Sequence, residues 1–293
     1  MRVLLSGAQG QVGRALAALQ PASVELHALT HRDLDICDAA AVRATLQRLA
    51  PDWIINAGAY TAVDRAETEP ALAEAVNAMG PAHLALAARS MPSCRLLQIS
   101  TDYVFDGRSR APYRPQDPTH PMSVYGRTKL QGEQAVKRIL ADRALILRTA
   151  WVYAPQGHNF LLTMLRLMRE RGEVRVVADQ FGSPTAAQSV ARAVWAALAR
   201  PLPPEAHILH WTDAGSCSWF DFAQLIAQGG LAAGLLDRPA RVTPITTAEY
   251  PTAAQRPAYS VLELAETAAA LELAPFPWAD SLQATLQALR PGT

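Results

Sequence analysis

The stretch Gly7-Ala8-Gln9-Gly10-Gln11-Val12-Gly13 decides the fold of this chain. It follows a short apolar run at 2–6 and opens a segment with a helical pattern that continues to Leu19. Glycines at such a junction allow a tight turn, bring backbone N–H groups close to a pyrophosphate and let the helix pack closely on the sheet. The helix dipole adds a field that favours an anion. We therefore expect a dinucleotide to contact Gly7, Gly10, Gln11, Val12 and Gly13, the alternative being a glycine-rich turn without a ligand.

Short apolar runs alternate with helix-length segments through the first half of the chain. The expected strands cover 2–6, 24–29, 53–57, 95–100 and 144–148, and the expected helices end near 19, 49, 89 and 139. This alternation is typical of βαβ units around a parallel sheet. Uninterrupted apolar pairs such as Ile54-Ile55 fit strands that are buried on both faces. The expected fold class is α/β, a Rossmann-type doubly wound parallel sheet.

The regular alternation weakens after Trp151. We expect residues 1–150 to form an NAD(P)-binding Rossmann domain and residues 151–293 to form mainly a smaller α/β C-terminal substrate lobe. The boundary is soft, and segments are expected to cross between the lobes.

Composition excludes several classes of protein. The net charge is +1 and the basic residues are scattered, so the sequence shows no footprint for nucleic acid or an anionic membrane. The three cysteines are far apart and form no CxxC pair, which favours free thiols in a reducing compartment and argues against zinc. The first apolar run is too brief for a signal peptide, so we expect a cytoplasmic protein.

The choice of cofactor depends on the end of the second expected strand. The usual acid that binds the ribose is replaced there by Thr30-His31-Arg32, and an arginine at this point can bind a 2′-phosphate. NADPH is therefore favoured over NADH. NADH stays possible because Asp33 and Asp35 lie close by, and because Arg32 could simply be an exposed residue beside a turn.

A Tyr-x-x-x-Lys pattern, Tyr125-Gly126-Arg127-Thr128-Lys129, lies on an expected helix. Residues four apart share one helix face, so we expect the Lys129 ammonium to act on the Tyr125 phenol and to lower its pKa. Tyr125 then becomes a usable acid. A surface pair without a function is the alternative for the motif alone.

The segment Ser100-Thr101-Asp102-Tyr103-Val104-Phe105 supports the catalytic interpretation of this helix. It follows a strand that is expected to be buried, and ligands of open α/β sheets bind beyond the carboxyl ends of the strands. The Thr101 hydroxyl should therefore meet Tyr125, and both should face one substrate carbonyl.

Together these motifs closely resemble the dTDP-4-dehydrorhamnose reductase family of extended short-chain dehydrogenases. The GxxGxxG spacing is that of the extended branch, and the resemblance covers nearly the whole chain. Its further motifs are Asn56–Glu67 (NAGAYTAVDRAE), Arg148–Tyr153 (RTAWVY), Asn159-Phe160, Asp179–Thr185 (DQFGSPT) and Arg256-Pro257.

The resemblance implies roles for individual residues. Thr101, Tyr125 and Lys129 would form the catalytic trio for reduction of the C4 keto group of a nucleotide-activated deoxysugar. Asp102 and Trp151 would contact the sugar. Cofactor contacts would come from Asp35 and Ile36 around the adenine, and from Ala59, Tyr60 and Thr61.

The resemblance also bears on the substrate lobe and on assembly. Arg256 is the expected partner of the substrate pyrophosphate, whereas Asn159 and Gln180 could be polar contacts or turn caps. Some relatives dimerise around Mg²⁺ held by carboxylates, but the corresponding stretches here, 13–16 and 186–189, contain no acid. Because Mg²⁺ prefers anionic oxygen ligands, we expect no bridging metal and a monomer, the alternative being a dimer formed through other surfaces.

Two other interpretations stay open at this point. Another sugar-nucleotide 4-ketoreductase or epimerase of the same superfamily would share the glycine turn and the Tyr/Lys pair. A non-catalytic, NADP-binding regulatory subunit would keep the turn, although the intact catalytic trio argues against it.

Overall fold

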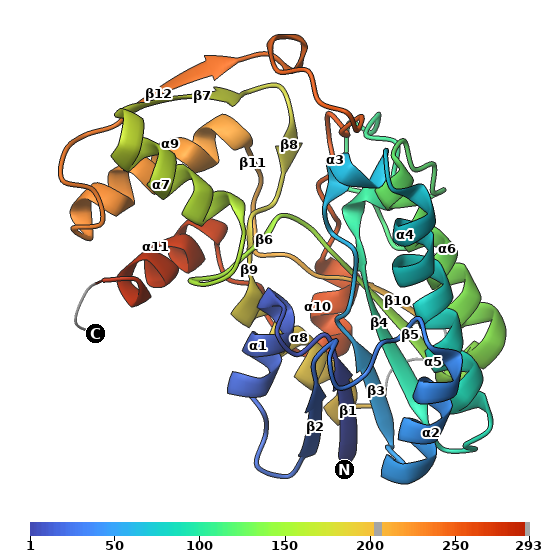
Figure 1. Cartoon of the computed structure of the whole chain (residues 1–293). Coiled ribbons are helices and arrows are strands. Elements are labelled where there is room, and N and C mark those ends of the chain that lie inside the picture. Colours follow the sequence, from blue (N-terminus) through green and yellow to red (C-terminus); the bar gives the residue numbers. More distant parts are fainter. Residues whose placement is uncertain (202–206, 291–293) are drawn as a thin grey trace.

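A six-stranded sheet in the order β10-β5-β4-β3-β1-β2 forms the base of the molecule, and all its strand pairs are parallel (Figure 1). The structure is a computed structural model and describes residues 1–201 and 207–290. The strands of this sheet are β1 (Arg2–Ser6), β2 (Glu25–Leu29), β3 (Trp53–Asn56), β4 (Arg95–Thr101), β5 (Ala144–Thr149) and β10 (Ile208–His210).

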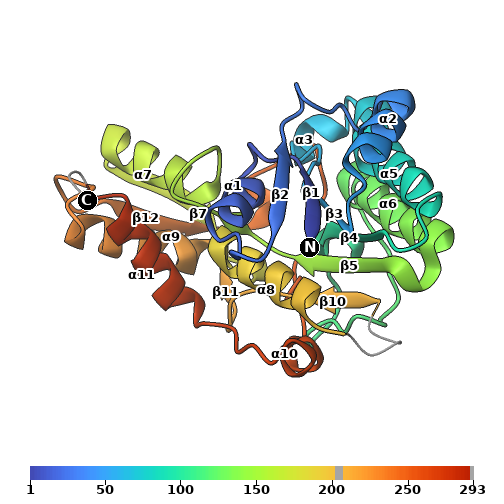
Figure 2. The ribbon, with the colours of Figure 1, turned by 90° about the horizontal axis from the view of Figure 1, so that it is seen from below.

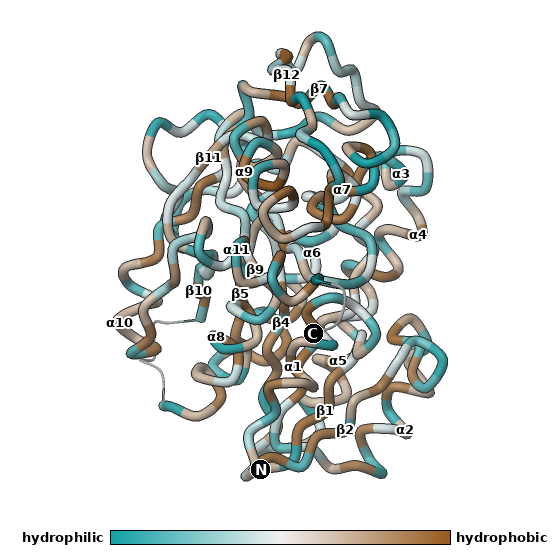
Figure 3. The backbone as a smooth tube through the Cα atoms, turned by 90° about the vertical axis from the view of Figure 1, so that its left-hand side faces the viewer, coloured by the Kyte–Doolittle hydropathy of each residue, from teal (hydrophilic) through white to brown (hydrophobic). Residues whose placement is uncertain are grey.

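Helices cover both faces of the sheet, so the expectation of a doubly wound α/β fold is confirmed (Figure 2). One face carries α2 (Ala39–Leu49), α5 (Gly80–Arg89) and α6 (Val124–Leu140), whose apolar side chains pack on β1, β3 and β4. The other face carries α1 (Gln11–Ala18) and α8 (Ala187–Ala199). β1 consists mostly of hydrophobic residues, as Figure 3 shows, because it is buried on both sides.

The helix expected up to residue 89 is interrupted. It consists of α4 (Pro70–Glu74), a π-helical turn at Ala75–Met79 and α5. The turn places Asn77 so that its side chain accepts a hydrogen bond from the Tyr60 backbone N–H at 2.9 Å and donates one to the Tyr60 carbonyl oxygen at 3.0 Å. These two hydrogen bonds anchor the loop that follows β3.

A C-terminal lobe stands above the carboxyl ends of the strands (Figure 1). Its core is formed by α7 (Phe160–Arg171), α9 (Trp219–Ala232) and α11 (Trp278–Ala288). Three two-stranded ladders complete it: β7 (Glu173–Val177) with β12 (Arg241–Ile245), β8 (Phe181–Gly182) with β11 (Cys217–Ser218), and β6 (Val152–Tyr153) with β9 (Thr185–Ala186).

Two elements from the second half of the chain belong to the sheet layer. β10 pairs with β5, and α8 packs against α1. Of the short helices, α3 (Val63–Ala66) packs against α4 and α6, and α10 (Ala265–Leu271) packs against α8. The division near residue 150 stays a prediction. In the described ranges, no helix is long and apolar enough to cross a membrane.

Candidate active site

The glycine-rich turn lies at the switch point, where the strand order reverses between β1 and β3. Gly7 has a left-handed φ of 74°, and a Cβ there would lie only 2.5 Å from the backbone nitrogen of Gly58, which follows β3. A Cβ on Gly13 would lie 2.2 Å from the Gly7 carbonyl oxygen. The turn therefore depends on both glycines to fit between the sheet and α1.

A cleft of about 860 Å³ opens from this turn between the sheet and the C-terminal lobe. Most of the residues that the sequence predicts for the site line it. They are Gly10, Gln11, Val12, Ala59, Thr61, Thr101, Asp102, Tyr125, Lys129, Trp151 and Arg256.

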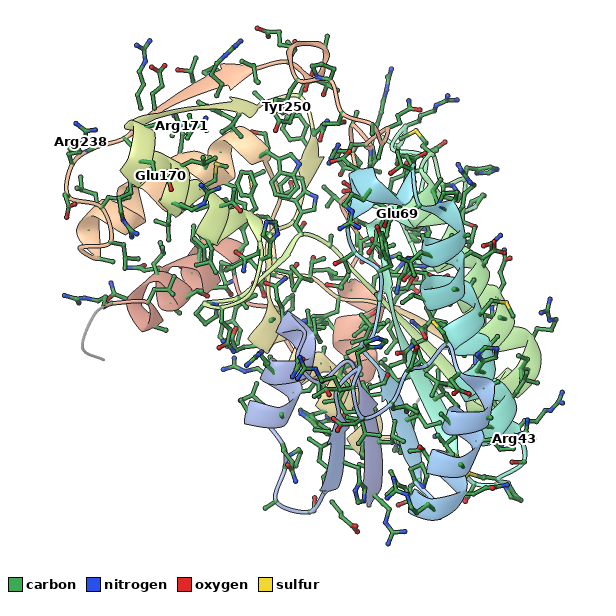
Figure 4. The ribbon with its side chains drawn as sticks, viewed as in Figure 1. Arg43, Glu69, Glu170, Arg171, Arg238 and Tyr250 are labelled. Atoms are coloured by element: carbon green, nitrogen blue, oxygen red, sulfur yellow. The ribbon has the colours of Figure 1, made fainter. Side chains whose placement is uncertain are left out.

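The other predicted cofactor residues do not line this cleft. Gly7 and Gly13 shape the turn, and the Tyr60 hydroxyl donates a hydrogen bond to Glu69, which Figure 4 labels beside α3 and α4. The remaining three lie after β2: Arg32 and Asp35 are exposed, whereas Ile36 is buried against Gly58 and Gly80. Their contacts with a cofactor stay predictions.

Thr101 ends β4, and Asp102 begins the 3₁₀ turn that follows it. The Thr101 hydroxyl donates to Asp102 Oδ1 at 3.0 Å and accepts from the backbone N–H of Tyr103 at 3.2 Å. Burial raises the pKa of Asp102 to about 6, although hydrogen bonds from Ser260 and Thr101 oppose the rise. The carboxylate thus orients the threonine hydroxyl at the base of the cleft.

Tyr125 lies in the first turn of α6, where Ser123 caps the helix by accepting from the Gly126 N–H at 3.1 Å. Burial raises the pKa of Tyr125 to about 12, a hydrogen bond with Thr101 opposes this rise, and the charge of Asp102 adds to it. The expectation that Lys129 lowers this pKa is wrong for this structure. The reason is that the loss of hydration dominates the environment of the phenol.

Lys129 is buried one helical turn further along α6. Its Nζ donates to the Ile99 carbonyl oxygen at 2.6 Å. Burial lowers the pKa of Lys129 to about 8, and the nearby carboxylate of Glu133 opposes this change. An ammonium group has three protons to donate, so Lys129 keeps donors for a second partner in the cleft.

Glu133 forms a buried, two-pronged ion pair with Arg148 of β5. The Nη2–Oε2 distance is 2.7 Å and the Nε–Oε1 distance is 3.0 Å. Arg148 also donates to the Pro115 carbonyl oxygen and approaches Nε2 of His210. Breaking such a pair leaves a buried charge unpaired, so this network holds α6 against β5.

Arg256 and Asp64 form an ion pair at the cleft, with Nη2 of the arginine 2.7 Å from Oδ2 of the aspartate. Asp64 also accepts from the backbone N–H of Ala254 at 3.1 Å. Arg256 is thus present at the cleft, but Asp64 occupies part of its guanidinium. Any anion that binds Arg256 competes with this carboxylate.

Several residues at the cleft escaped the sequence analysis. Ser100 and Thr149 line it, and their buried hydroxyl oxygens have no hydrogen-bond partner among the described residues. Trp219, from α9, also lines it. Ser100 and Thr149 stood inside motifs that were quoted for neighbouring residues, whereas nothing in the sequence around Trp219 pointed to the site.

The two open polar candidates have local partners. Asn159 caps α7 by accepting from the Leu162 N–H at 3.0 Å, and its amide donates to Gln11 Oε1 at 2.8 Å. It therefore joins the C-terminal lobe to the glycine-rich turn. Gln180 donates to the Thr247 hydroxyl at 3.0 Å.

The donor set of the cleft fits a nicotinamide dinucleotide. Because glycines leave the turn free of side chains, a pyrophosphate can approach its backbone N–H groups. The unpartnered hydroxyls of Ser100 and Thr149 lie further along the same cleft. In the described part of the chain no group of three or more His, Cys, Asp or Glu residues is arranged to hold a metal ion.

A glycine turn at the switch point that opens into the same cleft as a Tyr-x-x-x-Lys helix defines the class of the extended short-chain dehydrogenases/reductases. UDP-glucose 4-epimerases from Thermotoga maritima and Thermus thermophilus share this fold, with TM-scores of 0.81 and 0.80 at 17% and 18% identity. At that identity the likeness concerns the fold alone.

The chain belongs to the dTDP-4-dehydrorhamnose reductase family, since the family described as "RmlD substrate binding domain" matches residues 1–290. A dTDP-4-dehydrorhamnose reductase from Aggregatibacter actinomycetemcomitans is 40% identical over 287 residues, 96% of this chain and 97% of that protein. A probable dTDP-4,6-dihydroxy-2-methyloxan-3-one 4-ketoreductase from Streptomyces antibioticus is 44% identical over 89% of this chain and 86% of that protein.

Solved structures agree with this assignment. A dTDP-4-dehydrorhamnose reductase from Clostridium acetobutylicum matches with a TM-score of 0.91 and 38% identity, covering 99% of both chains. One from Bacillus anthracis, in complex with NADP, matches with a TM-score of 0.88 and 35% identity over 97% of this chain and 98% of that chain.

Proposed function

We propose that this chain catalyses the NADPH-dependent reduction of the C4 keto group of dTDP-4-dehydro-β-L-rhamnose to give dTDP-L-rhamnose, a precursor of cell-surface polysaccharide. The observation that carries the proposal is the convergence of Thr101, Tyr125 and Lys129 in one cleft with the glycine-rich turn. The family assignment supplies the substrate class.

NADPH, when bound, supplies the hydride that reduces C4. Tyr125 donates its proton to the C4 oxygen, on which negative charge develops. Because the pKa of Tyr125 is raised to about 12, the phenol is protonated at neutral pH, as a donor must be at the start of a reduction. Thr101 donates to the same oxygen once its hydroxyl turns away from Asp102, and solvent restores the tyrosine proton.

Lys129 holds the ribose of the nicotinamide and places a positive charge beside the reacting carbonyl. Its bond to Ile99 keeps the ammonium at the end of β4. Gly10, Gln11 and Val12 hold the pyrophosphate, and the exposed Arg32 binds the 2′-phosphate of NADPH. NADH is a poorer substrate on this account, because it lacks that phosphate.

On the substrate side, Asp102 and Trp151 contact the sugar and Arg256 binds its pyrophosphate. Arg256 exchanges the Asp64 carboxylate for the diphosphate when the nucleotide sugar binds. Both partners are anionic, so the exchange preserves the charge balance of the guanidinium.

The test is a turnover assay with dTDP-4-dehydro-L-rhamnose and each reduced nicotinamide, following the loss of NADPH or NADH absorbance and identifying the product. Stoichiometric oxidation of NADPH with formation of dTDP-L-rhamnose supports the proposal. It also separates a reductase from an epimerase, which recycles its bound cofactor, and from a regulatory subunit, which consumes none. No NADPH oxidation with this substrate would refute the assignment.

A second sugar belongs in the same assay because of the 44% identical Streptomyces antibioticus relative. Its printed name describes a 4-ketoreductase for dTDP-4,6-dihydroxy-2-methyloxan-3-one. A kcat/KM that is higher for that sugar than for dTDP-4-dehydro-L-rhamnose would reassign the substrate within the same chemistry.

For assembly we propose a monomer without a bridging Mg²⁺. The supporting observation is that the stretches 13–16 and 186–189 lack acids. Light scattering with and without Mg²⁺ tests this, and a dimer that dissociates on chelation would contradict it. The cytoplasmic location stays a prediction.

A further inference from the structure

One face of the Trp151 indole is covered by Trp219. The two ring centroids are 3.5 Å apart and the rings are inclined by only 6°. Trp151 follows β5 with a left-handed φ of 47°, a conformation that a bulky residue rarely adopts unless its surroundings hold it. The position of this ring is therefore imposed by its neighbours.

The opposite face of the same ring is covered by Gly182. A Cβ on Gly182 would lie 2.4 Å from Cε2 of Trp151 and slightly farther from the two neighbouring ring atoms, Nε1 at 2.6 Å and Cζ2 at 2.7 Å. Such a Cβ would stand above the ring plane rather than beside its rim. None of its three nearest atoms belongs to Trp219, so Gly182 and Trp219 lie on opposite faces.

Both neighbours come from one small ladder. Gly182 ends β8 and pairs with Cys217 of β11, and Trp219 follows directly after β11. Ser218 fixes the start of α9 by a reciprocal cap, in which its hydroxyl accepts from the Asp221 N–H and the Asp221 carboxylate accepts from the Ser218 N–H. We call Gly182 and Trp219 the Trp151 clamp.

Trp151 and Trp219 both line the cleft. Because the clamp covers both faces of the Trp151 indole, this ring presents its edge to the cleft. The Trp151 indole N–H has no hydrogen-bond partner among the described residues, and it is not among their fully enclosed, unpartnered polar groups. An indole N–H is a donor only. A hydroxyl or ring oxygen of a sugar is the matching acceptor.

We propose that Trp219 is a positioning residue that, together with Gly182, holds Trp151 edge-on to the cleft, so that the indole N–H donates to an oxygen of the deoxysugar. The sugar is then recognised by a hydrogen bond and by the indole rim, not by stacking on the ring face. This inference rests on the proposed function, because it assigns the Trp151 edge of the cleft to the sugar of that substrate.

The experiment measures calorimetric dissociation constants for dTDP, dTDP-L-rhamnose and NADPH, and KM and kcat for the keto sugar nucleotide. Trp219→Ala opens one face of Trp151, Trp219→Phe keeps an aromatic cover, and Trp151→Phe removes the N–H while keeping a ring. Trp278→Phe is the matched control, because Trp278 lies in the same lobe, packs on Phe222 and does not line the cleft.

We expect Trp219→Ala and Trp151→Phe to weaken dTDP-L-rhamnose about tenfold, the typical worth of one neutral hydrogen bond. Binding of dTDP and NADPH should stay unchanged, and KM should rise more than kcat falls. Trp219→Phe should bind dTDP-L-rhamnose within about threefold of the wild type, since aromatic cover is retained.

Three results would overturn the inference: unchanged dTDP-L-rhamnose binding in Trp219→Ala, an equal loss of dTDP binding, or no rescue by phenylalanine. A wild-type enzyme that fails to oxidise NADPH with the keto sugar would overturn the proposed function instead. The two failures are therefore distinguishable.

Discussion

The Nζ atom of Lys129 donates a 2.6 Å hydrogen bond to the carbonyl oxygen of Ile99, two residues before the end of β4. This bond ties the middle of α6 to the strand that carries Thr101. It also replaces the direct Lys129–Tyr125 interaction that the helical spacing predicted. The ammonium thus lies at the end of β4, and we expect catalysis to depend on its protonation state.

The first prediction concerns the dependence of kcat/KM on pH. Burial lowers the pKa of Lys129 to about 8, so the free enzyme loses its ammonium as the pH rises through about 8. We expect kcat/KM to fall above that pH, because this parameter reports the ionisations of the free enzyme.

The control for this prediction is Lys129→Arg. A guanidinium stays charged throughout the accessible range, so the variant should be slower but should lose the descending limb. A wild-type profile that stays flat to pH 10 would exclude Lys129 as the group that titrates.

Asp102 leads to a prediction about stability. Burial raises its pKa from 3.8 to about 6, so folding of the wild type is penalised where the carboxyl must ionise. The penalty is absent well below pH 3.8, grows from there to about 6 and is complete above it. Asp102→Asn keeps an acceptor for Thr101 and should therefore raise the unfolding free energy at pH 8, by at most about 3 kcal/mol.

Urea unfolding of both proteins at pH 8 and pH 5 checks this. The advantage of Asp102→Asn should shrink at pH 5, where Asp102 is largely protonated in the folded wild type. An advantage that is equal at both pH values, or a less stable variant at pH 8, would contradict the account.

The glycine-rich turn allows a paired prediction. A Cβ on Gly13 would meet the Gly7 carbonyl oxygen at 2.2 Å, whereas one on Gly10 would stay 3.3 Å from the same atom and lies at the cleft. Gly13→Ala should lower the melting temperature markedly, because backbone atoms must shift. Gly10→Ala should fold nearly normally but weaken NADPH binding, measured by fluorescence titration. Equal stability of the two variants would argue against the packing role of Gly13.

Substitutions of Arg256 and of Asp64 should have opposite effects on the binding of dTDP. Arg256→Met should weaken dTDP about 10- to 100-fold, the worth of a charged hydrogen-bonding partner. Asp64→Asn should strengthen dTDP binding, because the competing carboxylate is neutralised. Calorimetry measures both, with Arg238→Met as the control, since Arg238 is exposed at the far end of the C-terminal lobe (Figure 4).

Binding of dTDP that is unaffected by Arg256→Met would remove this residue from the diphosphate site. The ion pair with Asp64 would then serve only to hold the segment around residue 254 against α3.

The sheet could be predicted closely because its signal is local. Buried parallel strands read as uninterrupted apolar runs, and β1 was expected within the bounds that the structure gives it. The helix at 70–89 was expected, but the π-helical turn inside it was not, because such a turn changes the hydrogen-bond register without changing the hydrophobic pattern. The turn carries Asn77, whose partner Tyr60 lies 17 positions earlier in the chain.

The site was predictable where one motif supplied neighbouring residues of the cleft, as with Thr101 and Asp102. It was not predictable where partners meet across the lobes. Trp219 covers Trp151 although 68 positions separate them, and no spacing rule relates two residues on separate ladders. The pKa of Tyr125 was mispredicted because helical spacing gives proximity but not burial.

In the proposed mechanism Tyr125 donates the proton to the reduced carbonyl, and the turnover of Tyr125→Phe measures that role. We predict that kcat falls about 10²- to 10⁴-fold, the usual contribution of a general acid, while the dissociation constant of NADPH stays within about twofold. The phenylalanine preserves the ring contact with Tyr103, so the fold should be retained. A kcat equal to that of the wild type would show that Tyr125 is not the proton donor.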